Sequence, residues 1–168
     1  TAVLFTIGTG IGGAVFMDGK LLRGRATAGQ LGHVTVESEG ELCLCGRRGC
    51  VETTSSGTAL GHHLARAGLD PATVVEDLLK RAANGDAQAE DIMASWASPM
   101  RAAIDTVVAA FDPDLVVLGG GLGIAMHQAL QAFPAEAEWY RCPVVPASLG
   151  DQAGVIGAGL AARAHQSH

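Results

Sequence analysis

Four side chains near the start of the chain have the types and the spacing of a metal site. Cys43, Cys45 and Cys50 form a C-x-C-x4-C pattern, and His33 precedes them. Three thiolates and one imidazole make up a tetrahedral ligand set that suits zinc, and closed sets of this kind are structural. The sequence therefore predicts a structural zinc site in a loop that runs from Gly29 to Glu52.

The alternative is that these cysteines are ordinary buried thiols, since free cysteine packs well in apolar cores. The neighbouring residues disfavour this alternative. Arg47 and Arg48 lie inside the cysteine segment, and Glu39 and Glu41 precede it. A disulfide between the first two cysteines would close a very tight ring. Zinc is therefore the favoured interpretation.

Two glycine-rich runs are candidate ligand-binding loops. The first, Gly8 to Gly13, can direct bare N–H groups at a phosphate, and Thr9 adds a hydroxyl donor. It is not a Walker loop, because no G-K-[ST] sequence follows, and taken alone it is better explained as a hairpin turn. The second, Gly119 to Gly121, lies between an apolar strand and a helix, where a ligand can reach a helix N-terminus. Close packing at the turn explains the second run equally well.

Hydrophobic periodicity predicts the elements that position these residues. Asp70 and Asp86 are expected to cap the second and third helices, and Val74 to face the core. Pro99 should kink or divide the third helix, and Cys142 is assigned to packing. The last helix is rich in small residues that permit close contact with another surface. The order of elements is an α/β layout. Strands are expected at 2–7, 14–17, 20–22, 33–36, 115–118 and 144–145, and helices at about 53–68, 70–84, 86–111, 123–132 and 151–163.

Composition and charge exclude several classes of protein. The chain has 168 residues, with 17 acidic and 11 basic side chains and a net charge of -6. This acidic balance argues against a nucleic-acid surface, where a basic patch is expected. No apolar run approaches the ~20 residues of a membrane span, and no secretory signal opens the chain. Unpaired thiols arranged for a metal suit a reducing cytoplasm, and the first residue, Thr1, indicates a fragment or a processed product.

The motifs of the first third resemble those of the ROK family, which contains repressors, open reading frames and sugar kinases. GQLGH and CLCGRRGCVE resemble the family signatures G-E-x-G-H and C-x-C-G-x-x-G-C-x-E. The run TIGTGIGGAVFMDGKLLRG resembles the family's phosphate loop and the start of its long signature. The resemblance is close from Thr6 to Glu52 and looser later, through DLVVLGGGLG and GDQAGVIGAGLAA.

The resemblance implies that residues 1–168 are the C-terminal lobe of an α/β, actin-like (ribonuclease H-like) ATPase fold with a zinc-binding loop. It implies ATP-dependent phosphorylation of a sugar, with Mg²⁺, by a cytoplasmic homodimer. In the family the catalytic Asp and the first phosphate loop come from the N-terminal half, and neither motif is present here. No catalytic residue is therefore assigned in this chain, and the chain alone is expected to be inactive.

The resemblance also implies roles for individual residues. His33 would bind zinc and donate to the sugar, Glu52 would accept sugar hydroxyls, and Gln30 stands where most members have a sugar-binding Glu. An amide both donates and accepts hydrogen bonds without carrying charge. Bacterial N-acetylmannosamine kinases also lack this Glu, so N-acetylmannosamine is the expected substrate. The residues expected to contact the nucleotide are Gly8, Thr9, Gly10, Gly12, Gly120 and Gly121.

Two other functions stay open. The chain can instead be the effector domain of a ROK repressor, which binds a sugar without catalysis, or a zinc-stabilised lobe used for dimerisation. Repressors keep the zinc motif but often lose the phosphate loop. The intact TIGTGIGG run therefore favours the kinase.

Overall fold

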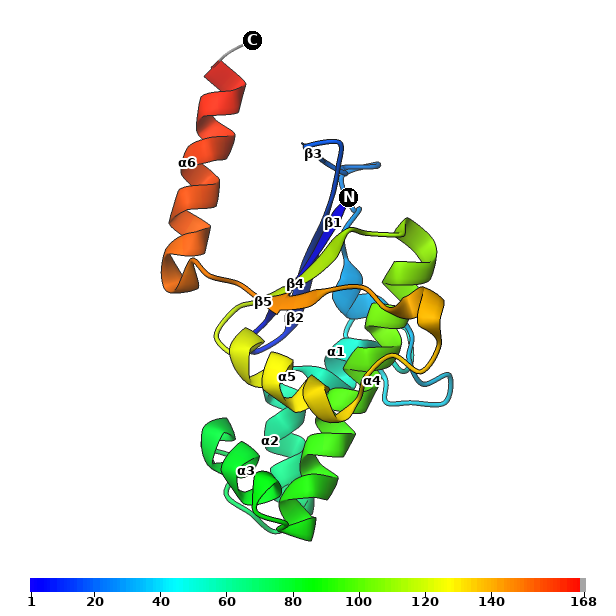
Figure 1. The fold of residues 1–168 in the computed structure, drawn as a ribbon, viewed down its shortest axis with the longest axis vertical. Helices are drawn as coiled ribbons and strands as arrows, with labels where there is room; N and C mark the ends of the chain where they lie inside the picture. Colours follow the sequence, from blue (N-terminus) through cyan, green and yellow to red (C-terminus); the bar gives the residue numbers. More distant parts are fainter. Residues whose placement is uncertain (167–168) are drawn as a thin grey trace.

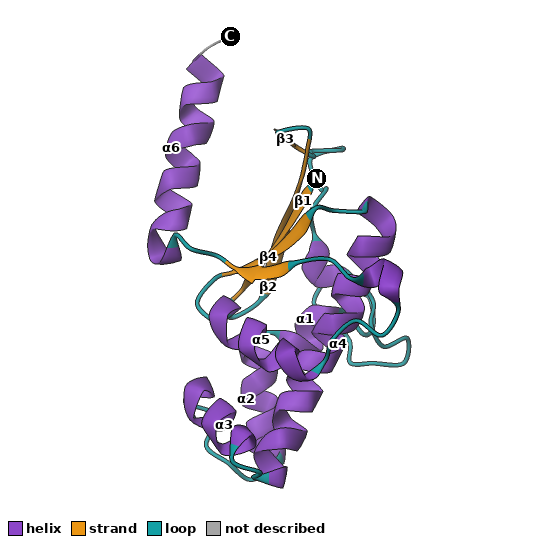
Figure 2. Cartoon of the chain, viewed as in Figure 1, coloured by secondary structure: helices purple, strands orange, loops and turns teal. Residues whose placement is uncertain are grey.

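The computed structural model describes residues 1–166, in which a five-stranded sheet carries most of the helices on one side (Figure 1; Figure 2). The strands are β1 (Ala2–Ile7), β2 (Ile11–Met17), β3 (Lys20–Leu21), β4 (Leu115–Gly119) and β5 (Val144–Pro146). The α-helices are α1 (Val51–Ser55), α2 (Gly57–Arg66), α3 (Val75–Ala83), α4 (Ala87–Phe111), α5 (Gly123–Ala129) and α6 (Ala153–Gln166). Short 3-10 helices lie at Leu31–His33, Leu130–Ala132, Glu138–Tyr140 and Gly150–Gln152.

The sheet runs in the order β3-β2-β1-β4-β5. β1 pairs with β2 in antiparallel and with β4 in parallel, so that Ala2 lies opposite Leu115 and Thr6 lies opposite Gly119. Parallel strands end at the same edge of a sheet, so the loops that follow β1 and β4 are neighbours. These two loops are the two glycine-rich runs.

The core joins the sheet to the helices. Phe5 and Ile7 of β1 are fully buried, and they belong to the same hydrophobic cluster as Trp96 and Met100 of α4. The indole N–H of Trp96 donates to the carbonyl of Ser56 at 3.0 Å, so this buried polar group has a partner. Burial of these large side chains fixes the end of β1, and with it the first glycine loop.

Most of the predicted elements are confirmed, including β1, β4, α5 and β5. Asp18 and Gly19 have φ values of 51° and 72°, which a tight turn between β2 and β3 requires. Asp86 caps α4 as predicted, since its carboxylate accepts the N–H groups of Gln88 and Ala89 at 3.1 and 3.2 Å. Local turn and cap chemistry was therefore readable from the sequence.

The strand predicted at residues 33–36 is wrong. Leu31–His33 forms a 3-10 helix, and the residues after it make one isolated bridge, between Thr35 and Cys50. A strand needs an extended partner, whereas the facing segment turns at Gly49, where φ is 67°. The segment is therefore held by this bridge and a few backbone hydrogen bonds rather than by a strand ladder.

The helix predicted at residues 53–68 is two helices, α1 and α2, which meet at Ser56. Ser56 is extended, with a ψ of 172°, and its hydroxyl accepts the N–H of Ala59 at 3.1 Å as the N-cap of α2. The capping residues were recognised in the sequence, but the short helix that precedes them was not.

The second predicted helix begins later than expected. Asp70 caps a turn, with its carboxylate accepting the N–H of Ala72 at 2.9 Å, and α3 begins at Val75. Val74 is the N-cap residue of α3 and is 55% exposed, so its predicted place in the core is wrong. The sequence does not distinguish a turn cap from a helix cap at Asp70, because in both a carboxylate accepts a nearby N–H.

Pro99 does not divide α4, which continues through it. An interior proline costs ~3 kcal/mol because it removes a helix hydrogen bond and crowds the preceding turn. Trp96 and Met100 flank the proline and are fully buried, and their burial offsets this cost.

α6 stands apart from the rest of the chain (Figure 1). Val155 is 78% exposed, and a side chain built at Gly154, Gly157 or Gly159 would meet nothing within 4 Å among the described residues. The close contact predicted for this helix is therefore not made within residues 1–166. No helix in this part of the chain is both long and apolar enough to span a membrane.

Candidate metal centre and ligand-facing loops

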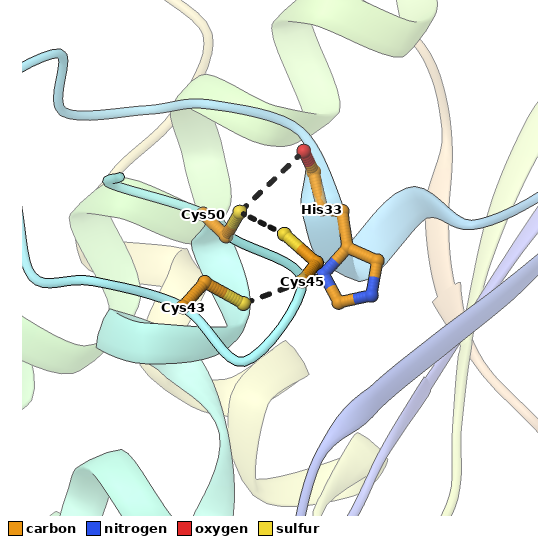
Figure 3. Close-up of side chains that lie close together, drawn as sticks. All are labelled: His33, Cys43, Cys45 and Cys50. Atoms are coloured by element: carbon orange, nitrogen blue, oxygen red, sulfur yellow. Dashed lines mark hydrogen bonds between the residues drawn. The ribbon is translucent and has the colours of Figure 1, made fainter. Parts of the chain in front are cut away.

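The four predicted metal ligands come together at one point (Figure 3). Their ligand atoms all lie within 4.8 Å of one another. Cys43 Sγ is 3.6 Å from His33 Nδ1, and Cys45 Sγ is 3.6 Å from Cys50 Sγ. In a tetrahedral site with Zn–S bonds of ~2.3 Å, neighbouring sulfur atoms lie ~3.8 Å apart. The four side chains therefore fit a structural zinc ion, and none of the cysteines is in a disulfide.

The backbone of the loop brings these ligands together by turning sharply at two glycines. The N–H of Cys43 donates to the carbonyl of Arg47 at 2.8 Å, and the N–H of Gly46 donates back to the carbonyl of Cys43 at 2.9 Å. Gly46 and Gly49 have φ values of 87° and 67°, which L side chains rarely adopt. A side chain at Gly49 would lie 1.5 Å from the carbonyl oxygen of Glu37, so glycine is required there.

The thiols of the site differ in acidity. Burial, together with the neighbouring thiols, raises the pKa of Cys50 to about 12. Cys45 is exposed, and a backbone hydrogen bond at Arg47 holds its pKa below the usual value. A metal must displace the proton of the buried thiol, so zinc binding is expected to weaken as pH falls.

Cys142 does not belong to this cluster. It is half-buried, and its thiol donates to the carbonyl of Pro113 at 3.2 Å. Burial raises its pKa, as it does for thiols packed in apolar surroundings. The packing role assigned to it from the sequence agrees with this position.

Ile11 connects Glu52 to the turn that carries His33, two of the three residues that the family resemblance places at the sugar. Its N–H donates to the Glu52 carboxylate at 2.8 Å. Its carbonyl lies against Gly32, where a side chain would come within 2.1 Å of the oxygen. Gly32 precedes His33 in the 3-10 helix, so Glu52 and the turn that carries His33 are both fixed to the start of β2. Gln30 is exposed at the other end of the same turn.

The first glycine run is the turn between β1 and β2, as its composition favoured. The carbonyl of Gly8 accepts the N–H of Gly57 at 2.7 Å. The carbonyl of Thr9 accepts the hydroxyl of Thr58 at 2.8 Å. The turn is therefore clamped to the first residues of α2, and its backbone shape is fixed without a ligand.

Packing within the chain explains some of the candidate nucleotide-binding glycines. A side chain at Gly10 would lie 2.6 Å from the Glu52 carboxylate, and one at Gly12 would lie 2.7 Å from Thr6 Oγ1. Gly120 has a φ of 80°, and a side chain there would lie 2.4 Å from the carbonyl oxygen of Ile7. Gly120 therefore needs glycine for the fold alone, whereas at Gly10 and Gly12 the neighbouring atoms are side-chain ends that can move.

Gly8 and Gly121 are different. A side chain at either position would meet nothing within 4 Å among the described residues, and neither has a positive φ. The loops that carry them are tied together, since the N–H of Leu122 donates to the carbonyl of Ile7 at 3.0 Å. Two open glycines thus lie on adjacent loops at one edge of the sheet, where a ligand can approach the backbone.

A cavity of about 330 Å³ lies beside the first glycine loop. It brings together Thr9, Gly10 and Glu52 with Thr58 and His62, which sequence reasoning did not select. The chain order gave no signal for His62, because only the packing of α2 against the zinc loop brings it there. Gln30 and His33 do not line this cavity, and Ile11 connects only Glu52 and Gly32, the residue before His33.

Comparison with known proteins identifies relatives of the whole chain. A model of the ROK family matches residues 1–165. An N-acetylmannosamine kinase of Yersinia pseudotuberculosis serotype O:3 (strain YPIII) is 37% identical over 165 residues, which are 95% of this chain and 56% of that protein. This chain therefore spans about half the length of the curated relatives it matches.

Solved structures of similar proteins share the fold. A ROK hexokinase from Thermus thermophilus is 34% identical, with a TM-score of 0.75 over 94% of this chain and 55% of that one. A ROK glucokinase from Streptomyces griseus, solved with glucose and AMPPNP, is 27% identical, with a TM-score of 0.73 over 94% of this chain and 58% of that one. The α/β fold of this chain is the actin-like ATPase fold that the sequence motifs implied.

Proposed function

This chain belongs to the ROK family, and we propose that it is the C-terminal lobe of an ATP-dependent sugar kinase. A second lobe would supply the catalytic Asp and the first phosphate loop, and no residue of this chain is assigned a catalytic role. The length of the relatives supports this division, because the chain matches only 56% of the similar N-acetylmannosamine kinase.

The junction at Ile11 is the observation that carries the proposal. It holds the Glu52 carboxylate beside the first glycine loop and sets the His33 turn against the same strand. In a sugar kinase the accepting hydroxyl must lie next to the phosphate donor, because phosphoryl transfer depends on positioning. A carboxylate that can accept sugar hydroxyls, fixed directly to a phosphate-loop candidate, fits that requirement.

The nucleotide would approach the sheet edge where β1 and β4 end. Gly8 and Gly121 would allow the backbone to approach ATP closely, and Thr9 would offer its exposed hydroxyl to a phosphate. Gly10, Gly12 and Gly120 would also contact the nucleotide, and Gly120 shapes its loop as well. Mg²⁺ accompanies ATP in this proposal and would neutralise charge on the transferred phosphoryl group.

The proposed substrate is an N-acylhexosamine, with N-acetylmannosamine as the best candidate. The 37% identical relative is named for that sugar. Gln30 is exposed at the turn that leads to His33, where a neutral amide can both donate to and accept from a substrate. A Glu there would instead offer a charged acceptor, whose hydrogen bonds are worth ~1.5–3 kcal/mol against ~0.5–1.5 for neutral ones.

Zinc has a structural role in this proposal. Held by His33, Cys43, Cys45 and Cys50, it would fix the loop that leads from the His33 turn to Glu52. The free thiols of the site suit a reducing cytoplasm, and a homodimer is the expected assembly. Sedimentation of the longer protein would test the assembly.

The test compares this chain with the longer protein that contains it. With ATP and Mg²⁺, the longer protein should phosphorylate N-acetylmannosamine with a higher kcat/KM than glucose. This chain alone should show only background phosphorylation, since the loss of a general base alone typically lowers the rate 10²–10⁴-fold. Gln30→Glu in the longer protein should shift the preference toward glucose, and Glu52→Ala should lower kcat/KM for both sugars. Sugar binding without turnover of any hexose would instead identify a repressor effector domain.

A further inference from the structure

We propose that Arg47 is a positioning residue that ties the cysteine-bearing part of the zinc loop, residues 37–50, to the turn that carries His33. By holding the His33 backbone against this segment, Arg47 would place the His33 ring for the metal before the metal binds. The proposal rests on the proposed function for the role of His33 toward the sugar, but its metal-binding part stands independently of that function.

The contacts of Arg47 join two segments that are far apart along the chain. Its Nη1 donates to the His33 carbonyl at 3.2 Å, and its Nη2 donates to Thr35 Oγ1 at 2.8 Å. The planar guanidinium holds its donors in a fixed fork, so it can bridge two neighbouring acceptors with defined geometry. At the other end, the Arg47 carbonyl accepts the N–H of Cys43, which is itself a ligand. One residue therefore spans from the cysteine loop to the histidine turn.

The turn that carries His33 is a 3-10 helix without a side-chain cap. Backbone hydrogen bonds attach the segment after it, since the N–H of Val36 donates to the Gly49 carbonyl at 2.8 Å and the N–H of Val51 donates to the Val34 carbonyl at 2.9 Å. Arg47 adds side-chain contacts to His33 and Thr35. The Cys50 sulfur lies 3.7 Å from the His33 carbonyl, and a thiol is a weak donor. The Arg47 guanidinium approaches the same carbonyl more closely, at 3.2 Å, and is the stronger partner.

Charge acts in the same direction as these contacts. Three thiolates, a neutral imidazole and Zn²⁺ together carry a net charge of about -1. A guanidinium on the same loop attracts that charge, although its exposure to solvent screens the effect. Charge alone, however, does not distinguish Arg47 from its neighbour.

Arg48 is a matched control within the same loop. It is exposed like Arg47 and carries the same charge. Its Nη1 donates to the carbonyl of Gly40 at 3.3 Å, and its backbone pairs with Leu42, so these contacts stay inside the zinc loop. A difference between variants of the two arginines therefore reports the tie to His33 rather than the loss of a positive charge.

The experiment compares Arg47→Met, Arg47→Lys and Arg48→Met in this chain. Zinc affinity is measured by competition with a chromophoric chelator, and the ligand field is read from the absorption spectrum of the Co²⁺-loaded protein. Arg47→Met should lower zinc affinity about 10- to 100-fold, the usual range for a residue that orients a metal ligand. It should also alter the Co²⁺ spectrum. Arg48→Met should leave the zinc affinity and the Co²⁺ spectrum near those of the wild type. Arg47→Lys should have a zinc affinity between those of the wild type and Arg47→Met, because an ammonium has no planar fork.

The same variants in the longer protein test the coupling to the sugar. Arg47→Met should raise KM for N-acetylmannosamine more than it lowers kcat, because it disturbs a residue that contacts the sugar rather than the base. Equal losses of zinc affinity in Arg47→Met and Arg48→Met, or an unchanged Arg47→Met, would overturn the proposal. A selective loss of zinc affinity in a protein that phosphorylates no sugar would support the tie and refute the proposed kinase.

Discussion

Fully buried apolar side chains hold β1 and β4 to α4, whereas the zinc loop is held by two isolated bridges, several backbone hydrogen bonds and its metal-binding side chains. Phe5, Trp96 and Leu118 have no exposed surface, while Leu42 and Leu44 of the loop are 65% and 104% exposed. Burial can stabilise the core by itself, since each large side chain removed from water contributes ~1.5–3 kcal/mol. The loop lacks that source and needs a ligand.

This difference assigns different sensitivities to the two regions. The core should respond to changes in packing volume and should be indifferent to metal. The zinc loop should respond to metal supply and pH, because its thiols must lose protons to bind zinc. Glu52 lies at the boundary, at the start of α1 but fixed to β2 through Ile11.

The largest effect is expected from a change in the core. Trp96→Ala removes a fully buried indole and its hydrogen bond to Ser56, and it should destabilise the fold by about 3–5 kcal/mol. Urea unfolding followed by circular dichroism measures this loss. Removal of zinc by a chelator should lower the same midpoint by less. If chelation costs the core as much as Trp96→Ala does, the two regions are not separately stabilised.

A smaller and local effect is expected inside the zinc loop. Gly49→Ala places a methyl group 1.5 Å from the Glu37 carbonyl, so the loop must rearrange and zinc affinity should fall at least tenfold. Gly46→Ala is the matched control, since Gly46 also has a positive φ but open space around it. Gly46→Ala should lower the free energy of unfolding by only the ~1–2 kcal/mol that a left-handed backbone costs an L residue. Chelator competition measures the zinc affinity of both variants. A larger loss of zinc affinity in Gly46→Ala than in Gly49→Ala would contradict this explanation.

The smallest effect is expected at the N-cap of α4. A hydrogen bond from Arg81 and the N–H of Ala89 hold the pKa of Asp86 below its usual 3.8. A depressed carboxyl pKa stabilises the fold above the unfolded value, and this contribution disappears as pH falls through the folded pKa. Asp86→Asn keeps a capping side chain but cannot titrate. Its Tm deficit should therefore be constant near neutral pH and shrink below about pH 4, with zinc content unchanged. A deficit that grows with acidity would contradict this assignment.

The sequence could predict features that depend on neighbouring residues. The cysteine spacing predicted the metal cluster, and apolar runs predicted β1 and β4. Asp86 predicted the start of α4 as its N-cap. The family motifs predicted the actin-like ATPase fold. Each of these depends on residue types close together along the chain, so no knowledge of packing was needed.

Features created by tertiary contacts could not be predicted in this way. The sequence after His33 predicts a strand. The facing segment turns at Gly49, so only one bridge forms, between Thr35 and Cys50. The sequence does not distinguish the glycines of the two runs, yet packing requires Gly120 and leaves open space at Gly8. The junction at Ile11 has no sequence signal, because it joins β2 to residues of two later segments.

Metal analysis of this chain, purified without added zinc, tests whether His33, Cys43, Cys45 and Cys50 hold a structural zinc ion. We expect one zinc per chain in the wild type, an unchanged content in Cys142→Ser, and loss of the metal in Cys45→Ser. Hydrogen exchange in Cys45→Ser should then rise from residues 29 to 52 and stay slow in β1, β4 and α4. A wild-type zinc content near zero, in a chain with a folded circular-dichroism spectrum and a protected 29–52 segment, would contradict the structural zinc site.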